Sequence, residues 1–374
     1  HGYATPRGTT YNAYLVVGDA RTALIDTVKA PFRGELLARI SSVPGVGRVD
    51  VIVSNHSEMD HSGSLAEVAR ALEPERVVAS PTAMKTLREH FDDLPGLTPI
   101  KEGEALDLGG ATLRFAETKM LHWPESMVTW CPEERVLFSQ DIFGLHYATG
   151  ERFDDEVDRA VLFHEAATYY ANIILPMAGT VLKGLEKLAG LGIEWRLIAN
   201  DHGPIWRSFI REIQERYRAW SEGRPSRKAV VLYDTMWGST EQMARAVAEG
   251  LIAGGSPVRV LPMQGTERAD VAMEVLEAGA LIVGSPTING TLFPSLADPL
   301  AYLRGLKPRG LVGAVFGSSS WAPLAPPQLR TLLEEMKVEI VAENLNCRFV
   351  PTAEDLLRCR SLGEQVAAVL ARKG

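Results

Sequence analysis

A short run of metal-ligand residues directly after an apolar strand most constrains what this chain can fold into. The predicted strand Val51–Val53 is followed within a few residues by four ionisable side chains, which are His56, Glu58, Asp60 and His61. Burying these groups together costs roughly several kcal/mol unless an opposite charge compensates, and a divalent cation compensates best. Loops that leave a strand are also where binding sites are usually built. The run therefore predicts a metal site at the end of this strand, with a solvated polar loop as the alternative.

Three later residues extend this set. His122, Asp141 and His202 each stand in a polar loop after a predicted strand, in the same kind of position as the first four. Any one of them alone would more often be an ordinary surface residue. Together with the first four they supply seven ligands, which is enough for a two-metal site. Imidazoles and carboxylates without a thiolate suit iron, manganese or zinc, and each added carboxylate shifts the preference toward harder, redox-active ions.

The pattern changes near residues 221–227, a polar and turn-rich stretch that predicts a domain linker. We therefore expect one domain over residues 1–226 and a second over 227–374. In the second, five apolar strands alternate with helices, which predicts a doubly wound parallel sheet. In the first, strands open each half and helices lie between and after them, including long helices over 165–189 and 205–220. This order predicts sheet packed on sheet with helices outside, so the whole chain is of the α/β class.

Three loops of the second domain share a position that suits a phosphate-bearing ligand. They follow the strands 229–234, 280–285 and 311–317, and carboxyl ends of parallel strands are where ligands bind in open α/β sheets. The first loop leads into a helix, whose N-terminal N–H groups favour an anion. By itself this loop could equally be a turn with a helix cap. The three loops contain Thr235, Met236, Trp237, Gly238, Ser239 and Thr240; Pro286, Thr287, Ile288, Asn289 and Gly290; and Ser318, Ser319, Ser320 and Trp321.

Composition excludes several function classes. The 374 residues carry a formal net charge of −8 without a basic stripe, which argues against a nucleic-acid binder. No apolar run approaches the roughly 18 residues of a membrane span, so we expect no membrane segment and a cytoplasmic location. The three cysteines form no CxxC pair and predict neither disulfides nor a thiolate metal site. The chain starts at His1 rather than Met, so we expect preceding residues.

The first metal-ligand run resembles the metallo-β-lactamase fold, and Glu58 matches its flavodiiron branch; zinc hydrolases of that fold usually have His there. The motif around His122, which reads His-Trp-Pro-Glu-Ser-Met, is similar too. The resemblance implies an αββα sandwich in which His56, Glu58 and His122 hold one iron and Asp60, His61 and His202 hold the other. Asp141 would bridge the two.

The three loops of the second domain resemble those of flavodoxins, which bind FMN. The resemblance implies that the loop 235–240 takes the phosphate and that the loops 286–290 and 318–321 surround the flavin ring. One difference stands in the third loop. Flavodiiron proteins commonly have an aromatic residue and a Gly-rich turn there, whereas this chain has three serines and Trp321.

The combined resemblance covers nearly the whole chain and implies a flavodiiron oxidoreductase that reduces dioxygen to water, nitric oxide to nitrous oxide, or both. It also implies a head-to-tail homodimer or dimer of dimers. Because no rubredoxin-like module follows the second domain, we expect a separate electron donor, such as a rubredoxin or a flavin or deazaflavin donor.

Two other classes stay open. The first is a zinc-dependent hydrolase of the metallo-β-lactamase fold with an accessory flavodoxin domain, and colourless protein that holds zinc would indicate it. The second is an electron carrier or binding protein with an inactive metal site, which flavin without metal would indicate. Glu58 argues against the hydrolase, and the complete set of seven ligands argues against the carrier.

Overall fold

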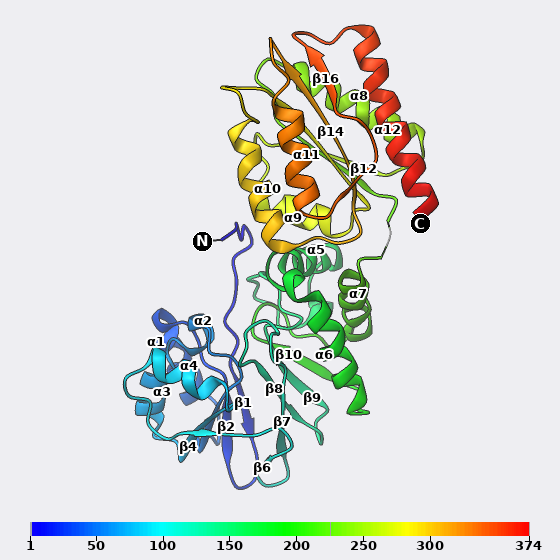
Figure 1. Ribbon diagram of the computed structural model, residues 1–374. Helices are drawn as coiled ribbons and strands as arrows, with labels where there is room; N and C mark the ends of the chain where they lie inside the picture. Colours follow the sequence, from blue (N-terminus) through cyan, green and yellow to red (C-terminus); the bar gives the residue numbers. More distant parts are fainter. Residues whose placement is uncertain (1, 225, 374) are drawn as a thin grey trace. The chain divides into compact units, whose positions relative to one another are not determined.

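The computed structural model describes residues 2–224 and 226–373, so the residues expected before His1 and position 225 of the predicted linker lie outside the described part (Figure 1). The chain divides into two compact units. The N-terminal unit contains Thr5–Tyr170 and Met177–Arg218, and the C-terminal unit contains Ala219–Gly374 with the short stretches His1–Ala4 and Ala171–Pro176. The domain boundary between residues 226 and 227 stays a prediction.

The first sheet of the N-terminal unit runs β1-β2-β3-β4-β5. Its strands are β1 (Tyr14–Val17), β2 (Thr22–Ile25), β3 (Val51–Ser54), β4 (Arg76–Ala79) and β5 (Leu97–Pro99). Alternate side chains of these strands point to opposite faces of the sheet. On one face, Leu24, Ile52 and Val77 belong to the same apolar cluster as residues of the helices. These helices are α1 (Arg33–Ser41), α3 (Leu65–Leu72) and α4 (Ala83–His90). One face of the sheet is therefore covered by helices.

The other face packs against the second sheet, which runs β10-β9-β8-β7-β6. Its strands are β6 (Ala105–Asp107), β7 (Thr112–Glu117), β8 (Met127–Cys131), β9 (Val136–Gln140) and β10 (Leu197–Asn200). Ile25 and Val53 of the first sheet share a buried cluster with Phe115 and Phe138 of the second. The neighbours of these residues on the second sheet, such as Leu137, are buried as well, so its outer face is also covered. The predicted sheet-on-sheet sandwich flanked by helices is confirmed.

The predicted helix over 165–189 is wrong in one respect, because it is broken in the middle. Helix α5 (Arg159–Tyr169) ends before an irregular stretch of π and 3₁₀ turns, and α6 (Ala178–Gly190) follows. Pro176 lies in that stretch, and its missing N–H and fixed φ disfavour an uninterrupted α-helix. Helix α7 (Ile210–Glu222) begins later than predicted, because Trp206 exchanges backbone hydrogen bonds with Ile198 instead.

The C-terminal unit is a parallel sheet in the order β12-β11-β13-β14-β15, with β16 also paired to β14. The strands are β11 (Ala229–Tyr233), β12 (Val258–Pro262), β13 (Ala280–Pro286), β14 (Val312–Ser319), β15 (Glu339–Ile340) and β16 (Leu345–Arg348). The helices between them are α8 (Ser239–Ala253), α9 (Arg268–Leu276), α10 (Pro294–Leu306) and α11 (Ala325–Glu335), and α12 (Ala353–Lys373) follows the last strand. The predicted doubly wound sheet is confirmed, with its last strand split into two short segments.

Among the described residues, no helix combines the length and the apolar character that crossing a membrane requires.

Candidate metal centre and flavin loops

The seven predicted ligands come from four loops at strand ends of the N-terminal unit. His56 follows β3, and Asp60 and His61 lie in the short helix α2 (Met59–Ser62), which Glu58 precedes. His122 lies between β7 and β8, Asp141 directly follows β9, and His202 is the second residue after β10. Because β3 belongs to one sheet and β9 and β10 to the other, the site lies where the two sheets meet.

The structure brings these residues together in two groups. The first contains His56, Glu58, His122 and Asp141, and the second contains Asp60, His61 and His202. Within each group, one potential ligand atom per residue lies within 4.8 Å of those of the others. The two groups contain the same residues as the two ligand sets that the resemblance implies, and their role as ligands stays a prediction.

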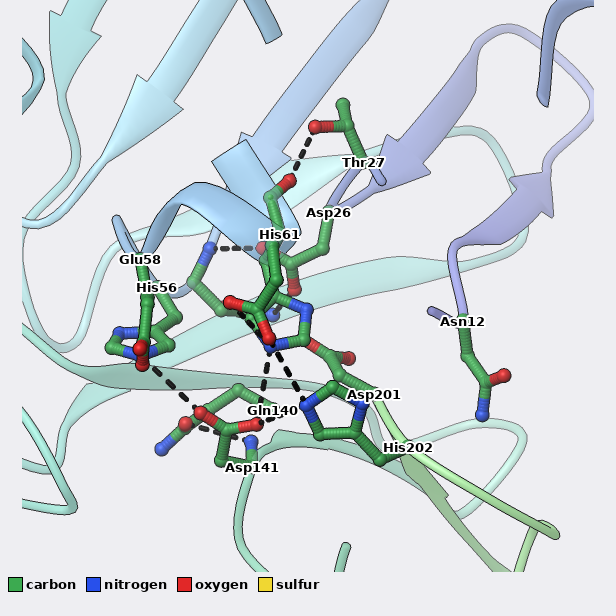
Figure 2. A network of polar contacts seen from close by, with 12 residues as sticks. Asn12, Asp26, Thr27, His56, Glu58, His61, Gln140, Asp141, Asp201 and His202 are labelled. Carbon is green, nitrogen blue, oxygen red and sulfur yellow. Dashed lines mark hydrogen bonds and ion pairs between the residues drawn. The ribbon is translucent and has the colours of Figure 1, made fainter. Parts of the chain in front are cut away.

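Asp141 stands between the groups (Figure 2). Its Oδ2 lies 2.9 Å from His122 Nε2 and 3.2 Å from His56 Nε2. Its Oδ1 lies 3.2 Å from Nε2 of both His61 and His202. Each carboxylate oxygen therefore faces the imidazoles of a different group, which is the arrangement that a bridging ligand needs.

Several of these atoms are buried without a hydrogen-bond partner. Among the described residues this holds for Asp60 Oδ1, His61 Nε2 and Asp141 Oδ1, even though His61 and Asp141 approach within 3.2 Å. Buried polar atoms are almost always hydrogen-bonded, and those that are not call for an explanation such as an ion. Ligand atoms around a metal ion lie close to one another without hydrogen bonds between them, and these buried atoms are arranged in the same way. The residues therefore fit a pair of metal ions.

Ion pairing dominates the electrostatics of the cluster. Burial acts to raise the pKa of Glu58, but hydrogen bonds from His122 and His56 lower it to about 2. Burial acts to lower the pKa of His122, but Asp141 and Glu58 raise it to about 9. Likewise the carboxylates of Asp141 and Asp60 outweigh burial and raise the pKa of His202 to about 10. Without metal, the raised pKa values keep His122 and His202 protonated at neutral pH. Metal binding should therefore release these protons.

The outward ring nitrogens of the imidazoles have partners of different charge. His56 Nδ1 lies 3.1 Å from the buried carboxylate of Glu125, and His202 Nδ1 lies 2.7 Å from the backbone oxygen of Thr10. His61 Nδ1 lies 3.4 Å from Asp201, without hydrogen-bond geometry. These contacts to Glu125, Asp201 and Thr10 were not predicted from the sequence. The sequence signal for Glu125 was its place in the motif that begins at His122.

Two further buried groups lie beside the centre. Asp26 accepts hydrogen bonds from the backbone and side-chain nitrogens of Asn55, and burial raises its pKa to about 6. The ring of His146 lies 5.1 Å from that of His202, and burial followed by the charge of His202 lowers the pKa of His146 to about 3. His146 is therefore neutral at physiological pH.

In the C-terminal unit, the predicted phosphate loop leads from β11 into α8. Gly238 caps this helix with φ of 84°, a left-handed conformation that favours glycine. Its N–H donates to Thr235 Oγ1 at 3.0 Å, which folds the loop back on itself. The side chain of Trp237 is 87% exposed, so it is free to contact a ligand.

The other two predicted loops lie next to the first. Strands β11, β13 and β14 are neighbours, so their carboxyl ends share one edge. The loop after β13 turns at Asn289 and Gly290, which both have positive φ, as in a type I′ turn. Thr287 N–H donates to the backbone oxygen of Ser318 at 2.8 Å, and Ser318 Oγ lies 2.9 Å from Thr240 Oγ1. Ser318 thus links all three loops.

The remaining predicted flavin residues differ in exposure. Ser319 is nearly buried, whereas Trp321 is 90% exposed at the tip of the third loop and Met236 is also exposed. The backbone oxygen of Ser320 accepts a hydrogen bond from Arg348 Nε at 3.0 Å, which supports this loop from the β16 side. The three loops therefore form one edge of the sheet with a helix N-terminus and two exposed indoles, features that suit a flat aromatic ligand with a phosphate, such as FMN.

Comparison with known proteins finds a separate family match for each of the two parts of the chain. A family model described as "ODP family beta lactamase" matches residues 9–203, and one described as "Flavodoxin" matches residues 231–363. The chain is 42% identical to a nitric oxide reductase of Moorella thermoacetica, a match that covers 99% of this chain and 94% of the relative. It is 40% identical to a rubredoxin-oxygen oxidoreductase of Megalodesulfovibrio gigas (100% and 94% covered) and to a coenzyme F420H(2) oxidase of Methanothermobacter marburgensis (100% and 94%).

Solved structures give the same result. The fold matches rubredoxin oxygen:oxidoreductase from Desulfovibrio gigas with a TM-score of 0.96 and 39% identity, covering 100% of this chain and 94% of that one. It matches the flavodiiron protein from Giardia intestinalis with a TM-score of 0.95 and 31% identity, covering 100% and 92%. The chain belongs to the flavodiiron family. As a flavodiiron protein it is an oxidoreductase with a beta-lactamase-like and a flavodoxin-like part.

Proposed function

We propose that this flavodiiron protein reduces dioxygen to water, nitric oxide to nitrous oxide, or both, at a di-iron centre that receives electrons through FMN. The observation that carries the proposal is the placement of Asp141, whose two oxygens face two separate groups of imidazoles and carboxylates. A two-metal zinc hydrolase could use a shared carboxylate as well, so the choice of a reductase rests on the second part of the chain. The flavodoxin-like part in the same chain supplies a place for a redox cofactor, which hydrolysis does not use.

The proposed ligands are His56, Glu58 and His122 for one iron and Asp60, His61 and His202 for the other, with Asp141 shared. Two ferrous ions and one reduced flavin would together supply the four electrons that reduction of dioxygen to water requires. Iron suits this role because zinc does not change valence. Hydrogen bonds at the Nδ1 atoms of His56 and His202, to Glu125 and to the backbone oxygen of Thr10, hold their Nε2 atoms toward Asp141.

In the flavodoxin-like part, we propose that the loop 235–240 binds the FMN phosphate through backbone N–H groups at the start of α8. The residues proposed to surround the flavin ring are Pro286, Thr287, Ile288, Asn289, Gly290, Ser318, Ser319, Ser320 and Trp321. In the third loop, the exposed indole of Trp321 would supply the aromatic contact to the flavin that other flavodiiron proteins commonly make with the aromatic residue before a Gly-rich turn.

We further propose that electrons come from a separate donor, and that the protein acts as a head-to-tail homodimer or dimer of dimers. Relatives named rubredoxin-oxygen oxidoreductase and coenzyme F420H(2) oxidase support donors of the rubredoxin and deazaflavin types. The choice between dioxygen and nitric oxide is a property to be measured, because relatives at nearly equal identity bear names of both kinds.

Metal and flavin analysis of purified protein, followed by turnover assays, tests the proposal. We expect yellow protein with about one FMN and two iron ions per chain, which consumes dioxygen or nitric oxide when a reduced donor is supplied. Zinc at full occupancy after growth with iron available, together with no reductase activity after iron reconstitution, would refute the assignment and favour the hydrolase.

A further inference from the structure

Behind His56, on the ring side away from Asp141, lies a carboxylate that no proposed metal contact uses. Glu125 is 1% exposed. A single oxygen, Oε1, lies 3.1 Å from His56 Nδ1 and accepts from the backbone N–H of Ser57 at 3.2 Å and from its hydroxyl at 2.8 Å. In the described part of the chain, no lysine or arginine forms an ion pair with it. A buried carboxylate whose one oxygen faces three donors is held in a single orientation, and that orientation is toward His56.

The backbone, rather than the side chain, keeps Glu125 in place. The hydroxyl of Ser80, at the end of β4, donates to the backbone oxygen of Glu125 at 2.7 Å. Two residues later, the N–H of Met127 donates to the backbone oxygen of Asn55 at 3.0 Å. The loop that carries Glu125 is thus attached to both the β3 and β4 loops by contacts that a change of its side chain would leave intact. A substitution here can therefore remove charge without removing the loop.

The other imidazoles with a described partner are not supported in this way. His202 Nδ1 faces a neutral backbone oxygen, that of Thr10, and His61 Nδ1 lies 3.4 Å from Asp201 without hydrogen-bond geometry. Among these three imidazoles, only His56 has a carboxylate within hydrogen-bond distance and geometry on its outward nitrogen. The contact is therefore specific to the group that also contains Glu58 and His122.

We propose that Glu125 is a positioning residue that acts through His56: it fixes the ring with Nε2 toward the metal and increases the electron donation of that imidazole. A carboxylate on the outward N–H fixes the tautomer of a ligating histidine and raises its basicity. More negative charge behind the ligand stabilises ferric over ferrous iron, so Glu125 would hold down the potential of the iron bound by His56. The inference rests on the proposed function for the identity of that metal as iron.

The test compares Glu125→Gln with the wild-type full chain. Glutamine keeps the size and an oxygen that accepts the same hydrogen bonds, so mainly the charge is lost. Titration of the metal-free proteins with Co²⁺, followed by the ligand-field absorption of the bound ion, should show binding about 10- to 100-fold weaker in the variant. In the iron-loaded proteins, the Fe(III)/Fe(II) midpoint potential should rise. A tenfold greater loss of affinity for ferric than for ferrous iron corresponds to about 59 mV. The FMN potentials should stay the same.

Two further variants separate this role from a structural one. Ser80→Ala removes a buried hydrogen bond to the same loop without touching the carboxylate, and should keep wild-type Co²⁺ affinity and iron potential. Glu125→Asp keeps the charge and should restore part of both. Wild-type affinity and potential in Glu125→Gln would overturn the proposal. The proposal would also be overturned if two results occurred together. In the first, Glu125→Asp has the same Co²⁺ affinity and iron potential as Glu125→Gln. In the second, metal-free Glu125→Gln melts at a temperature well below that of Ser80→Ala, which would indicate a structural role.

The Co²⁺ titration needs neither iron nor turnover. Wild-type protein that binds Co²⁺ but reduces neither dioxygen nor nitric oxide would therefore refute the proposed function, while the comparison of the Glu125 variants would still decide the role of this residue.

Discussion

Replacing Asp141 by Asn would remove one negative charge from the middle of the proposed metal centre with almost no change in side-chain size. The two carboxylate oxygens of Asp141 face different imidazole groups, at 2.9 and 3.2 Å on one side and 3.2 Å on the other. An amide has only one oxygen, and its NH₂ group cannot ligate a cation. The Asn variant would therefore offer a neutral ligand to one metal and a hydrogen-bond donor to the other.

The size of the effect follows from the charge that is lost. A carboxylate shared by two divalent ions presents about half a unit charge to each, and half a charge about 4 Å from a double charge interacts by about 4 kcal/mol at an effective dielectric constant of about 20. Each 1.4 kcal/mol corresponds to about a tenfold change in an equilibrium constant, so binding of each metal should weaken by roughly a thousandfold. We expect protein purified with less than stoichiometric iron and little or no reductase turnover, while FMN stays bound, because the flavin loops belong to the other compact unit.

The assay is metal content by mass spectrometry, FMN content by absorption, and turnover, all per chain and against wild type. Asp154→Asn is a suitable control, because Asp154 is also fully buried in the same unit but accepts hydrogen bonds from Ser208 and Phe209 away from the centre. The control should keep its iron even if it melts at a lower temperature. Two iron ions per chain and unchanged turnover in Asp141→Asn would show that another group bridges the metals.

Three further predictions concern metal choice, assembly and pH. Glu58→His should weaken iron retention, raise zinc occupancy and abolish reductase turnover with FMN still bound; wild-type iron content and turnover would show that Glu58 does not select the metal. We expect the proposed head-to-tail dimer to pass electrons from the flavin of one chain to the iron of its partner. Folded monomers obtained by dilution or by an interface substitution should therefore keep both cofactors but pass electrons from flavin to iron more slowly, and equal rates in monomer and dimer would contradict transfer between chains. In metal-free protein, the raised pKa of His122, about 9, means that its charged form stabilises the fold below about pH 6.5, and that this contribution is lost as pH rises through about 9. The lowered pKa of Glu58, about 2, contributes stability above about pH 4.5 that is lost only as pH falls through about 2. Melting temperatures of metal-free protein from pH 4 to 10 should therefore fall on the alkaline side, and a flat profile there would contradict the ion pairing.

The sequence predicts the position of the site well because the relevant signals are local. An apolar run followed by polar residues marks a strand end, and all seven predicted ligands do lie at or near such ends. Strands that pair in one sheet, or in two packed sheets, then place their loops side by side. For this reason the sequence alone predicts that His56 and His202, far apart in the chain, share one site. Their role as metal ligands stays a prediction.

The parts that the sequence does not reveal depend on contacts between distant segments. The motif that begins at His122 contains Glu125 but does not show what its carboxylate contacts, and only the pairing of its loop with the loops after β3 and β4 buries it against His56. Asp201 stands beside His202 in sequence, yet its carboxylate points to His61. The break between α5 and α6 did have a local signal in Pro176, which an otherwise helical pattern obscured. Short elements such as β5 and β6 have too few residues for a periodic pattern.

The exposure of the seven residues shows from which side a substrate would reach the centre. The side chains of His56 and His61 are fully buried, and those of Asp141 and His202 nearly so. In contrast, Glu58 is 38% exposed and Asp60 is 28% exposed. Each of these two carboxylates belongs to a different ligand group, so the open side of the centre borders both proposed metal positions at once. A small diatomic molecule that enters beside Glu58 and Asp60 would therefore meet both metals, whereas the side of Asp141 is closed to it. This open side, where Glu58 stands in place of the histidine usual in zinc hydrolases, is what we expect to distinguish the reductase centre from a zinc hydrolase site of the same fold.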